Sequence, residues 1–78
     1  MDNLEETIQI LARALFIPSE SIKAEDKLLE LKGMDSLAFE TIIVELEDAT
    51  GRDIDVAQAV GTETVADLAE LLQKLRSA

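Results

Sequence analysis

Gly33-Met34-Asp35-Ser36-Leu37 is the stretch in which a loop gives way to a helix, and the rest of the fold is arranged around it. Asp35 is a good N-cap residue, because its carboxylate can accept a hydrogen bond from an N–H of the first helical turn. Ser36 then takes the first helical position, with its hydroxyl beside the unpaired amides and partial positive charge of the helix N-terminus. A helix end of this kind favours a bound or attached phosphate.

No residue near Ser36 in the sequence is suited to activate its hydroxyl for catalysis. The chain has no His and no Cys, and Lys32, on the loop side, is a poor general base near neutral pH. The run from Asp48 fails as a calcium loop, because its sixth position is Asp53 and its twelfth is Ala59. The sequence therefore predicts no catalytic residue and no metal site, and Ser36 is interpreted as a residue that another protein modifies.

The composition bounds the size, the location and the partners of the protein. Its 78 residues, 47% of them hydrophobic, suffice for one domain over residues 1–78 with one small core. No apolar run approaches the ~20 residues of a membrane helix, so we expect a cytoplasmic protein without membrane insertion. Seventeen acidic and seven basic residues give a net charge of −10, which disfavours nucleic acid and favours partners with basic docking surfaces.

Periodic apolar positions predict an all-α fold, a four-helix bundle with three main helices and one short helix. The first helix is expected over roughly residues 3–16, begun by a capping-box-like pair, Asn3 and Glu6. Residues 17–34 form a long connection that we expect to be ordered, with a short helical turn near residues 26–30. Its aliphatic side chains spaced as anchors into the core are Ile22, Leu28 and Leu31.

The second helix is expected from Ser36 to about Thr50, with Gly51 ending it. Its core face is predicted to hold Phe39, Ile42, Ile43, Leu46 and Ala49. The short helix is expected to cover one side of the core with Val56, Ala59 and Val60. The last helix should begin with a capping pair, Thr64 and Asp67, and its apolar side consists of Val65, Leu68, Leu71, Leu72 and Leu75.

Leu37 and Val44 lie seven residues apart, on a line through the acidic side of the second helix. Residues 35–50 contain five carboxylates and no basic residue, so their repulsion would be relieved by a basic partner. The same repulsion predicts a melting temperature that rises with salt and with millimolar Mg²⁺ or Ca²⁺. Two scattered surface aliphatics are normal in proteins, but an apolar row within carboxylates is typical of a docking helix, which is the interpretation that we prefer.

The run Asp35-Ser36-Leu37 opens this acidic helix after a loop that contains Glu25-Asp26-Lys27-Leu28 and Leu31-Lys32-Gly33. Ile54 lies eighteen residues after the serine, and Thr64-Val65-Ala66-Asp67-Leu68 opens the last helix. Together with the length and a pI near 4.1, this pattern resembles the acyl carrier proteins over essentially the whole chain. Asp-Ser-Leu alone is a weak signal, and its position within the four-segment plan makes the resemblance specific.

The resemblance implies that Ser36 carries a covalent 4′-phosphopantetheine arm, added from coenzyme A by a phosphopantetheinyl transferase. The thiol of the arm holds acyl groups as thioesters, and a non-catalytic carrier, expected to be monomeric, presents them to acyl-transferring and synthase enzymes with basic docking patches. These enzymes belong to fatty-acid, polyketide or specialised lipid biosynthesis. The resemblance assigns partner docking to Asp35, Leu37, Val44, Glu47 and Asp48, and the acidic face of the second helix adds Glu40. An apolar interior able to shelter the cargo is predicted from Phe39, Ile42, Ile43, Leu46, Val60, Val65 and Leu68.

The chain departs from the carriers of fatty-acid synthesis at several positions. Those carriers usually place a small aliphatic residue four positions after the serine and Glu five positions after it, where this chain has Glu40 and Thr41. Thr50 stands where Phe is frequent, and Phe39 brings an aromatic ring elsewhere onto the buried face. These departures indicate a reshaped cargo interior and a dedicated carrier for polyketide or specialised lipid synthesis. The alternatives are an aminoacyl or peptidyl carrier, against which Asp35 and the net charge argue, and a small acidic adaptor with an unmodified serine.

Overall fold

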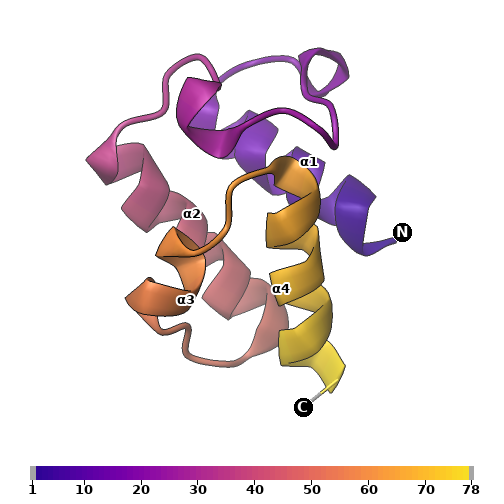
Figure 1. The fold of residues 1–78 in the computed structure, drawn as a ribbon, viewed down its shortest axis with the longest axis vertical. Coiled ribbons are helices and arrows are strands. Elements are labelled where there is room, and N and C mark those ends of the chain that lie inside the picture. The colour runs from indigo at the N-terminus through magenta and orange to yellow at the C-terminus, as the bar shows by residue number, and fades with distance from the viewer. Residues whose placement is uncertain (1, 78) are drawn as a thin grey trace.

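The computed structural model describes residues 2–77, which fold into a helical bundle with approximate dimensions of 30 × 26 × 19 Å. Its elements are α1 (Asn3–Leu15), η1 (Ser19–Ser21), η2 (Leu28–Glu30), α2 (Ser36–Thr50), α3 (Val56–Val60) and α4 (Val65–Ser77), where η denotes a 3₁₀ helix. α1 packs against both α2 and α4, and the short α3 packs on α4 (Figure 1). The predicted all-α fold of three main helices and one short helix is confirmed.

The start of α1 differs from the prediction. Asp2 is the N-cap, and its Oδ1 accepts a hydrogen bond from the Glu5 N–H at 2.6 Å. Asn3 and Glu6 were predicted to form a capping box, and this was wrong. Both side chains instead accept hydrogen bonds from Arg76 of α4, each at 2.8 Å, so they join the two ends of the chain.

The core is built from one stripe of each main helix together with anchors from the long connection. Its buried apolar residues include Ile10, Leu11, Leu15, Ile22, Leu28, Leu31, Ile42, Ile43, Leu46, Ile54, Ala59, Val65, Leu68, Leu71 and Leu72. All three predicted anchors of the connection are therefore confirmed.

Three residues predicted to cover the core are exposed. Ala49 lies in the last turn of α2, at the edge of the buried stripe. In α3 only Ala59 is buried, while Val56 and Val60 remain exposed. A helix of five residues presents one position squarely to the core, and here that position is Ala59.

The long connection between α1 and α2 is held in place by the N-terminus of α4. The N–H of Val65 donates to the carbonyl of Asp26 at 3.0 Å. The next N–H, that of Ala66, donates to the carbonyl of Ala24 at 2.9 Å. These two amides would otherwise lack a partner at the start of the helix. The connection is thus ordered as expected, and its predicted helical turn is η2.

The remaining amides at this helix start are satisfied by the predicted capping pair. The N–H of Asp67 donates to the Thr64 hydroxyl, and the N–H of Thr64 donates to the Asp67 carboxylate, both at 3.1 Å. The same carboxylate also accepts from the N–H of Glu63 at 3.1 Å.

In the described part of the chain, no helix has the length and apolar character needed to cross a membrane.

Candidate functional site

The candidate site is the start of α2, which the predicted N-cap defines. Asp35 has extended backbone angles, and its Oδ1 accepts a hydrogen bond from the N–H of Ala38 at 2.7 Å. Ser36 is the first helical residue and is exposed. The helix ends before Gly51, whose φ of 68° lies in the left-handed region. Both ends of α2 therefore agree with the sequence prediction.

The turn that leads into α2 depends on Gly33. Its φ is 87°, a conformation that L side chains rarely adopt. A Cβ atom added at this position would lie 3.3 Å from the carbonyl oxygen of Leu15, at the end of α1. Gly33 thus lets the loop pass close to α1 before the chain turns at Asp35 into the second helix.

The Ser36 hydroxyl is reachable from solvent and has no activating neighbour. Within residues 2–77 it takes part in no hydrogen bond. The first bond of the α2 ladder runs from the N–H of Phe39 to the carbonyl of Asp35 at 2.9 Å. The amides of Ser36 and Leu37 precede that bond, so they leave partial positive charge beside the hydroxyl.

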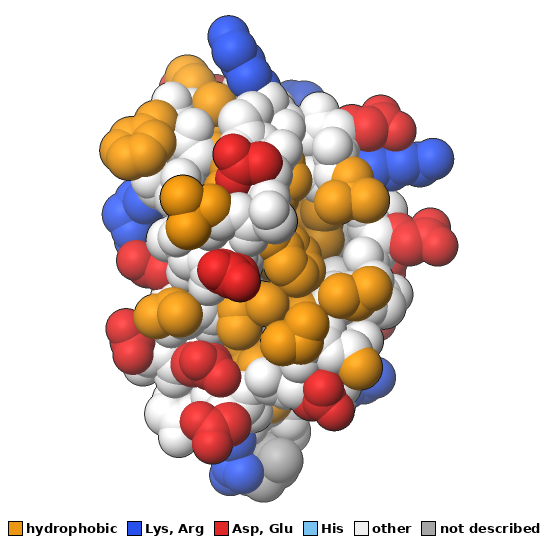
Figure 2. Space-filling view, turned by 90° about the vertical axis from the view of Figure 1, so that its left-hand side faces the viewer, with side chains coloured by type: hydrophobic (Ala, Val, Ile, Leu, Met, Phe, Trp, Pro, Cys, Tyr) orange, Lys and Arg blue, Asp and Glu red, His pale blue; other side chains and the backbone are white. Residues whose placement is uncertain are grey.

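An apolar groove of about 320 Å³ opens beside Ser36. It lies between the loop, the first turn of α2 and the α3 segment, and it is lined by Leu28, Leu29, Met34, Asp35, Ser36, Phe39, Ala59, Val60 and Thr62. Figure 2 shows this side of the molecule, where apolar side chains gather in the middle of the face, carboxylates lie among and around them, and Lys and Arg side chains lie at the edges. The serine therefore stands at the edge of an apolar cleft.

The groove overlaps only in part with the predicted cargo interior. Phe39 and Val60 line it, although Val60 is 67% exposed and lies at the mouth. The other predicted residues are packed into the closed core, namely Ile42, Ile43, Leu46, Val65 and Leu68. Sequence reasoning missed Leu29 and Met34, since neither fits a helical period. Their position in the loop directly before Ser36 is the signal that could have found them.

The outer face of α2 carries the predicted apolar row. Leu37 is 72% exposed and Val44 is 54% exposed, and the carboxylates of Asp35, Glu40 and Asp48 are also on exposed residues. Glu47 lies at the side of this face and is only half-exposed, because its Oε2 accepts a hydrogen bond from the Ile54 N–H at 2.8 Å.

Glu45, on the flank of α2, forms an ion pair with Arg13 of α1 at 3.3 Å. Two of the four carboxylates of α2, those of Glu45 and Glu47, thus have partners outside the helix. The sequence of α2 alone shows neither of these partners.

Comparison with known proteins agrees with this geometry. Residues 5–72 match the family described as "Phosphopantetheine attachment site". The chain is also 42% identical over 67 residues to a protein named "Acyl carrier protein" from Saccharopolyspora erythraea, an alignment that covers 86% of this chain and 70% of the relative. The chain belongs to the acyl carrier protein family. Members of this family are non-catalytic carriers that interact with modifying and synthase enzymes, and the match implies a covalent 4′-phosphopantetheine in this carrier.

The start of α2 in this carrier fits such a group. The Ser36 hydroxyl is exposed, the first amides of the helix suit a phosphodiester, and an apolar groove begins at the same residue. The nearest carboxylate, that of Asp35, is occupied by its bond to the Ala38 N–H. The residues present thus offer a nucleophilic oxygen, an electropositive helix end and an apolar surface at one point.

The perturbed carboxyl groups of the carrier lie at other helix ends. The backbone N–H groups of Thr64 and Glu63 hold the pKa of Asp67 below its ordinary value. The hydrogen bond and charge of Arg76 lower the pKa of Glu6 in the same way. Neither group lines the groove beside Ser36. Among the described residues there is also no cluster of three or more acidic, His or Cys side chains that could hold a metal ion.

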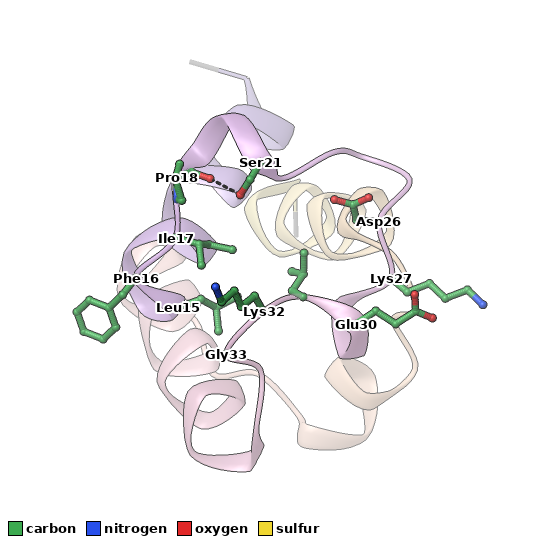
Figure 3. A pocket seen from close by; sticks show the side chains of 11 residues that line it. Leu15, Phe16, Ile17, Pro18, Ser21, Asp26, Lys27, Glu30, Lys32 and Gly33 are labelled. Carbon is green, nitrogen blue, oxygen red and sulfur yellow. Dashed lines mark hydrogen bonds between the residues drawn. The ribbon is translucent and has the colours of Figure 1, made fainter.

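A larger hollow of about 630 Å³ lies under the loop after α1, and Ser36 is not part of its lining. Its labelled side chains come from the end of α1 and from the loop, and those of Lys27 and Glu30 point outward (Figure 3). The Ser21 hydroxyl donates to the Pro18 carbonyl at 2.7 Å, so it is already used within the loop. We assign no chemistry to this hollow.

Proposed function

We propose that Ser36 is the residue that carries the 4′-phosphopantetheine arm and that the chain holds acyl intermediates on it as thioesters. The observation that carries this proposal is the position of the serine: its exposed hydroxyl begins α2 and borders the apolar groove. When bound, the arm supplies a thiol, a group that this chain lacks because it has no Cys.

The residues around Ser36 have separate tasks in this proposal. Asp35 fixes where the helix begins and therefore where the hydroxyl points, and Gly33 permits the turn that precedes it. Phe39, Val60 and the loop residue Leu29 offer an apolar wall against which an acyl chain can be kept from water. Since the groove is open to solvent on one side, the cargo can leave it when a partner enzyme binds.

The attachment is tested by incubating the apo protein with coenzyme A and a broad-specificity phosphopantetheinyl transferase, followed by intact mass measurement. We expect the wild type to gain the mass of one phosphopantetheine and Ser36→Ala to gain none. Ser77→Ala is the matched control. Ser77 is also exposed on a helix, but it is the last residue of α4 and does not line the groove. No mass gain in the wild type, or a gain that survives Ser36→Ala, rejects the proposal.

We further propose that the outer face of α2 is the surface on which partner enzymes dock. Leu37 and Val44 supply apolar contacts there, and Asp35, Glu40 and Asp48 supply charges for basic residues of the partner. Glu47 contributes its charge to this surface while its Oε2 holds Ile54. Val44→Ala and Asp48→Asn should each raise the KM of the carrier for the transferase.

Glu70→Gln is the control for charge in this docking test, because Glu70 is an exposed carboxylate on α4, away from the proposed surface. The effect of Asp48→Asn should shrink as salt is added, since exposed charges are screened. Equal effects of Asp48→Asn and Glu70→Gln would show that only the net charge matters, against a docking face on α2.

For the cargo we propose a dedicated role in polyketide or specialised lipid synthesis. The observation that supports this is Phe39, which places an aromatic ring in the lining of the groove. Loading the carrier with acyl donors of increasing chain length, and with aminoacyl donors as the contrast, tests the proposal. The mass of the protein purified from its native host gives the same answer directly, because arm and cargo remain attached.

A further inference from the structure

Phe16 is a large apolar side chain that the fold does not use. It is 93% exposed, more than any other large hydrophobic residue in the described chain. Figure 3 shows its ring directed away from the body of the protein. The ring therefore adds nothing to the core, and an exposed aromatic ring of this kind lowers solubility unless something covers it.

The backbone of Phe16 is also poorly suited to its side chain. The residue ends α1 with φ 57° and ψ 43°, and its N–H donates to the Ala12 carbonyl. Among residues 2–77 it is the only residue other than Gly with a positive φ. This left-handed position at a helix end is normally filled by Gly or Asn. Neither local conformation nor packing explains the aromatic ring, and strain of this kind points to a function.

The position of Phe16 indicates what that function is. Phe16 and Leu37 line one hollow of about 550 Å³ between the end of α1 and the start of α2, with Ala14 and Ala38 as further apolar lining. Leu37 directly follows Ser36 in the chain. Asp35 and Leu37, the residues on either side of Ser36, both line the hollow, so a protein that covers it contacts both neighbours of the serine.

Arg13 offsets the charge of Glu45 at the rim of the hollow, so the preference for a basic occupant comes from Asp35 and from the net charge of −10. Asp35 and Glu45 both line the hollow, and Glu45 is joined there by its ion-pair partner Arg13. A second copy of this chain would bring another net charge of −10 against these carboxylates, which disfavours self-association. The occupant expected from charge is thus a different protein, one that surrounds an apolar side chain with Lys or Arg.

We propose that the α1–α2 hollow, bordered by Phe16 and Leu37, receives an apolar side chain of the phosphopantetheinyl transferase. The inference rests on the proposed role of Ser36, because the transferase must bring its reacting groups to that hydroxyl. The phosphoryl transfer itself is unchanged: the serine Oγ forms a bond to phosphorus, coenzyme A loses the adenosine bisphosphate, and the serine proton is taken up by the transferase. Phe16 anchors the enzyme beside the reaction and does not take part in it.

The test measures steady-state modification of the apo protein by a broad-specificity phosphopantetheinyl transferase and coenzyme A. Phe16→Gly and Phe16→Asn remove the ring while suiting the left-handed backbone, and Phe16→Leu keeps an apolar side chain. We expect the KM for the carrier to rise about tenfold in the Gly and Asn variants, with kcat unchanged and most of the affinity kept by Leu. Because apolar burial is not screened, this rise should persist at high salt.

The following controls distinguish a failure of the role of Phe16 from a failure of the role of Ser36. Val56→Ala, which trims an exposed aliphatic side chain of α3, should leave the KM unchanged. An unchanged kcat/KM in Phe16→Gly, while the wild type is still modified at Ser36, overturns the inference and leaves the attachment residue intact. A mass gain that survives Ser36→Ala overturns the proposed function instead.

Two further measurements show whether the Phe16 variants lose a contact with the transferase, lose stability, or lose self-association. If Phe16→Gly melts below the wild type, the comparison rests on Phe16→Asn, whose side chain also suits this backbone. Sedimentation velocity then tests self-association: a wild-type dimer that becomes monomeric in Phe16→Gly would assign the hollow to a second copy and overturn the inference.

Discussion

The carboxylate of Glu47 accepts a hydrogen bond from the backbone N–H of Ile54, with 2.8 Å between Oε2 and the nitrogen. Ile54 is buried in the core, in the connection between α2 and α3. The bond thus ties the last turns of α2 to the chain that leads into the short helix. A residue that the family resemblance assigns to partner docking also holds the fold together.

Removing this carboxylate should destabilise the protein. In Glu47→Ala the amide of a buried residue loses its partner, and we expect the free energy of unfolding to fall by about 1–2 kcal/mol. Asp48→Ala is the matched control, since it removes the same charge from an exposed residue of α2 and should change stability by less than about 0.5 kcal/mol. Urea unfolding of the two variants gives the comparison. Equal losses would mean that the bond to Ile54 contributes nothing beyond the charge.

Replacement by Ala should change the free energy of unfolding differently at Gly33 and at Gly61, the glycines before and after the site. Gly33→Ala forces a side chain into φ 87° and brings its Cβ to 3.3 Å from the Leu15 carbonyl oxygen, so we expect a loss of about 1–2 kcal/mol. Gly61 follows α3 with φ −71°, an ordinary helical value, and an added Cβ would lie 3.4 Å from the nearest carbonyl oxygen. Gly61→Ala should therefore be neutral or slightly stabilising.

Thermal melting of both glycine variants checks this pair. The result that contradicts the structure is a Gly33→Ala protein that melts with the wild type, because the turn into Ser36 would then not need a positive φ.

Local signals explain why part of the fold was predictable. The N-cap of α2 is a single Asp directly before a periodic segment, and Gly51 is the one residue near its C-terminus that typically ends a helix. Both boundaries of α2 therefore follow from neighbouring residues. The capping pair of α4 is equally local. At the start of α1, by contrast, Asp2 and Asn3 are both good N-caps, and local chemistry does not choose between them. The choice is made by Arg76, which lies at the far end of the sequence and occupies Asn3.

The candidate site, too, was predictable from the sequence only in part. The exposure of Ser36, Leu37 and Val44 follows from helical periodicity, because α2 packs on the core with one face only. The groove does not, since it depends on how the loop and α3 approach α2 in space. Leu29 and Val60 border it while remaining largely exposed, an arrangement that no hydrophobic period predicts.

Salt should stabilise the carrier by screening its excess of carboxylates. With a net charge of −10, the melting temperature should rise as NaCl is added at neutral pH. Millimolar MgCl₂ should raise the melting temperature as well, because divalent cations are attracted to the same carboxylates. Calorimetry in the two salts provides the measurement. A melting temperature that is insensitive to both would contradict the account of the acidic surface, and a saturable rise specific to Mg²⁺ would reveal a bound ion.

The contact between the two chain ends should make stability depend on pH. Arg76 donates to both Asn3 and Glu6 at 2.8 Å, and its hydrogen bond lowers the pKa of Glu6 below the ordinary value of 4.5. A carboxyl whose pKa is lower in the folded state stabilises the fold above its unfolded pKa. That contribution is lost as the pH falls below 4.5 and through the folded value.

Arg76→Gln tests this contact, with Lys74→Gln as the control for the same charge change in the last turn of α4. Near neutral pH we expect Arg76→Gln to be less stable than Lys74→Gln by less than about 1 kcal/mol, because both side chains of the ion pair are partly exposed and screened by solvent. The difference should shrink once the pH lies well below the ordinary pKa of Glu6, since the carboxylate is then protonated in both states. NMR titration of the Glu6 carboxyl should show its pKa returning toward 4.5 in Arg76→Gln and staying low in Lys74→Gln. A gap between the variants that is unchanged in acid would show that Arg76 acts through Asn3 or through packing, and not through the charge of Glu6.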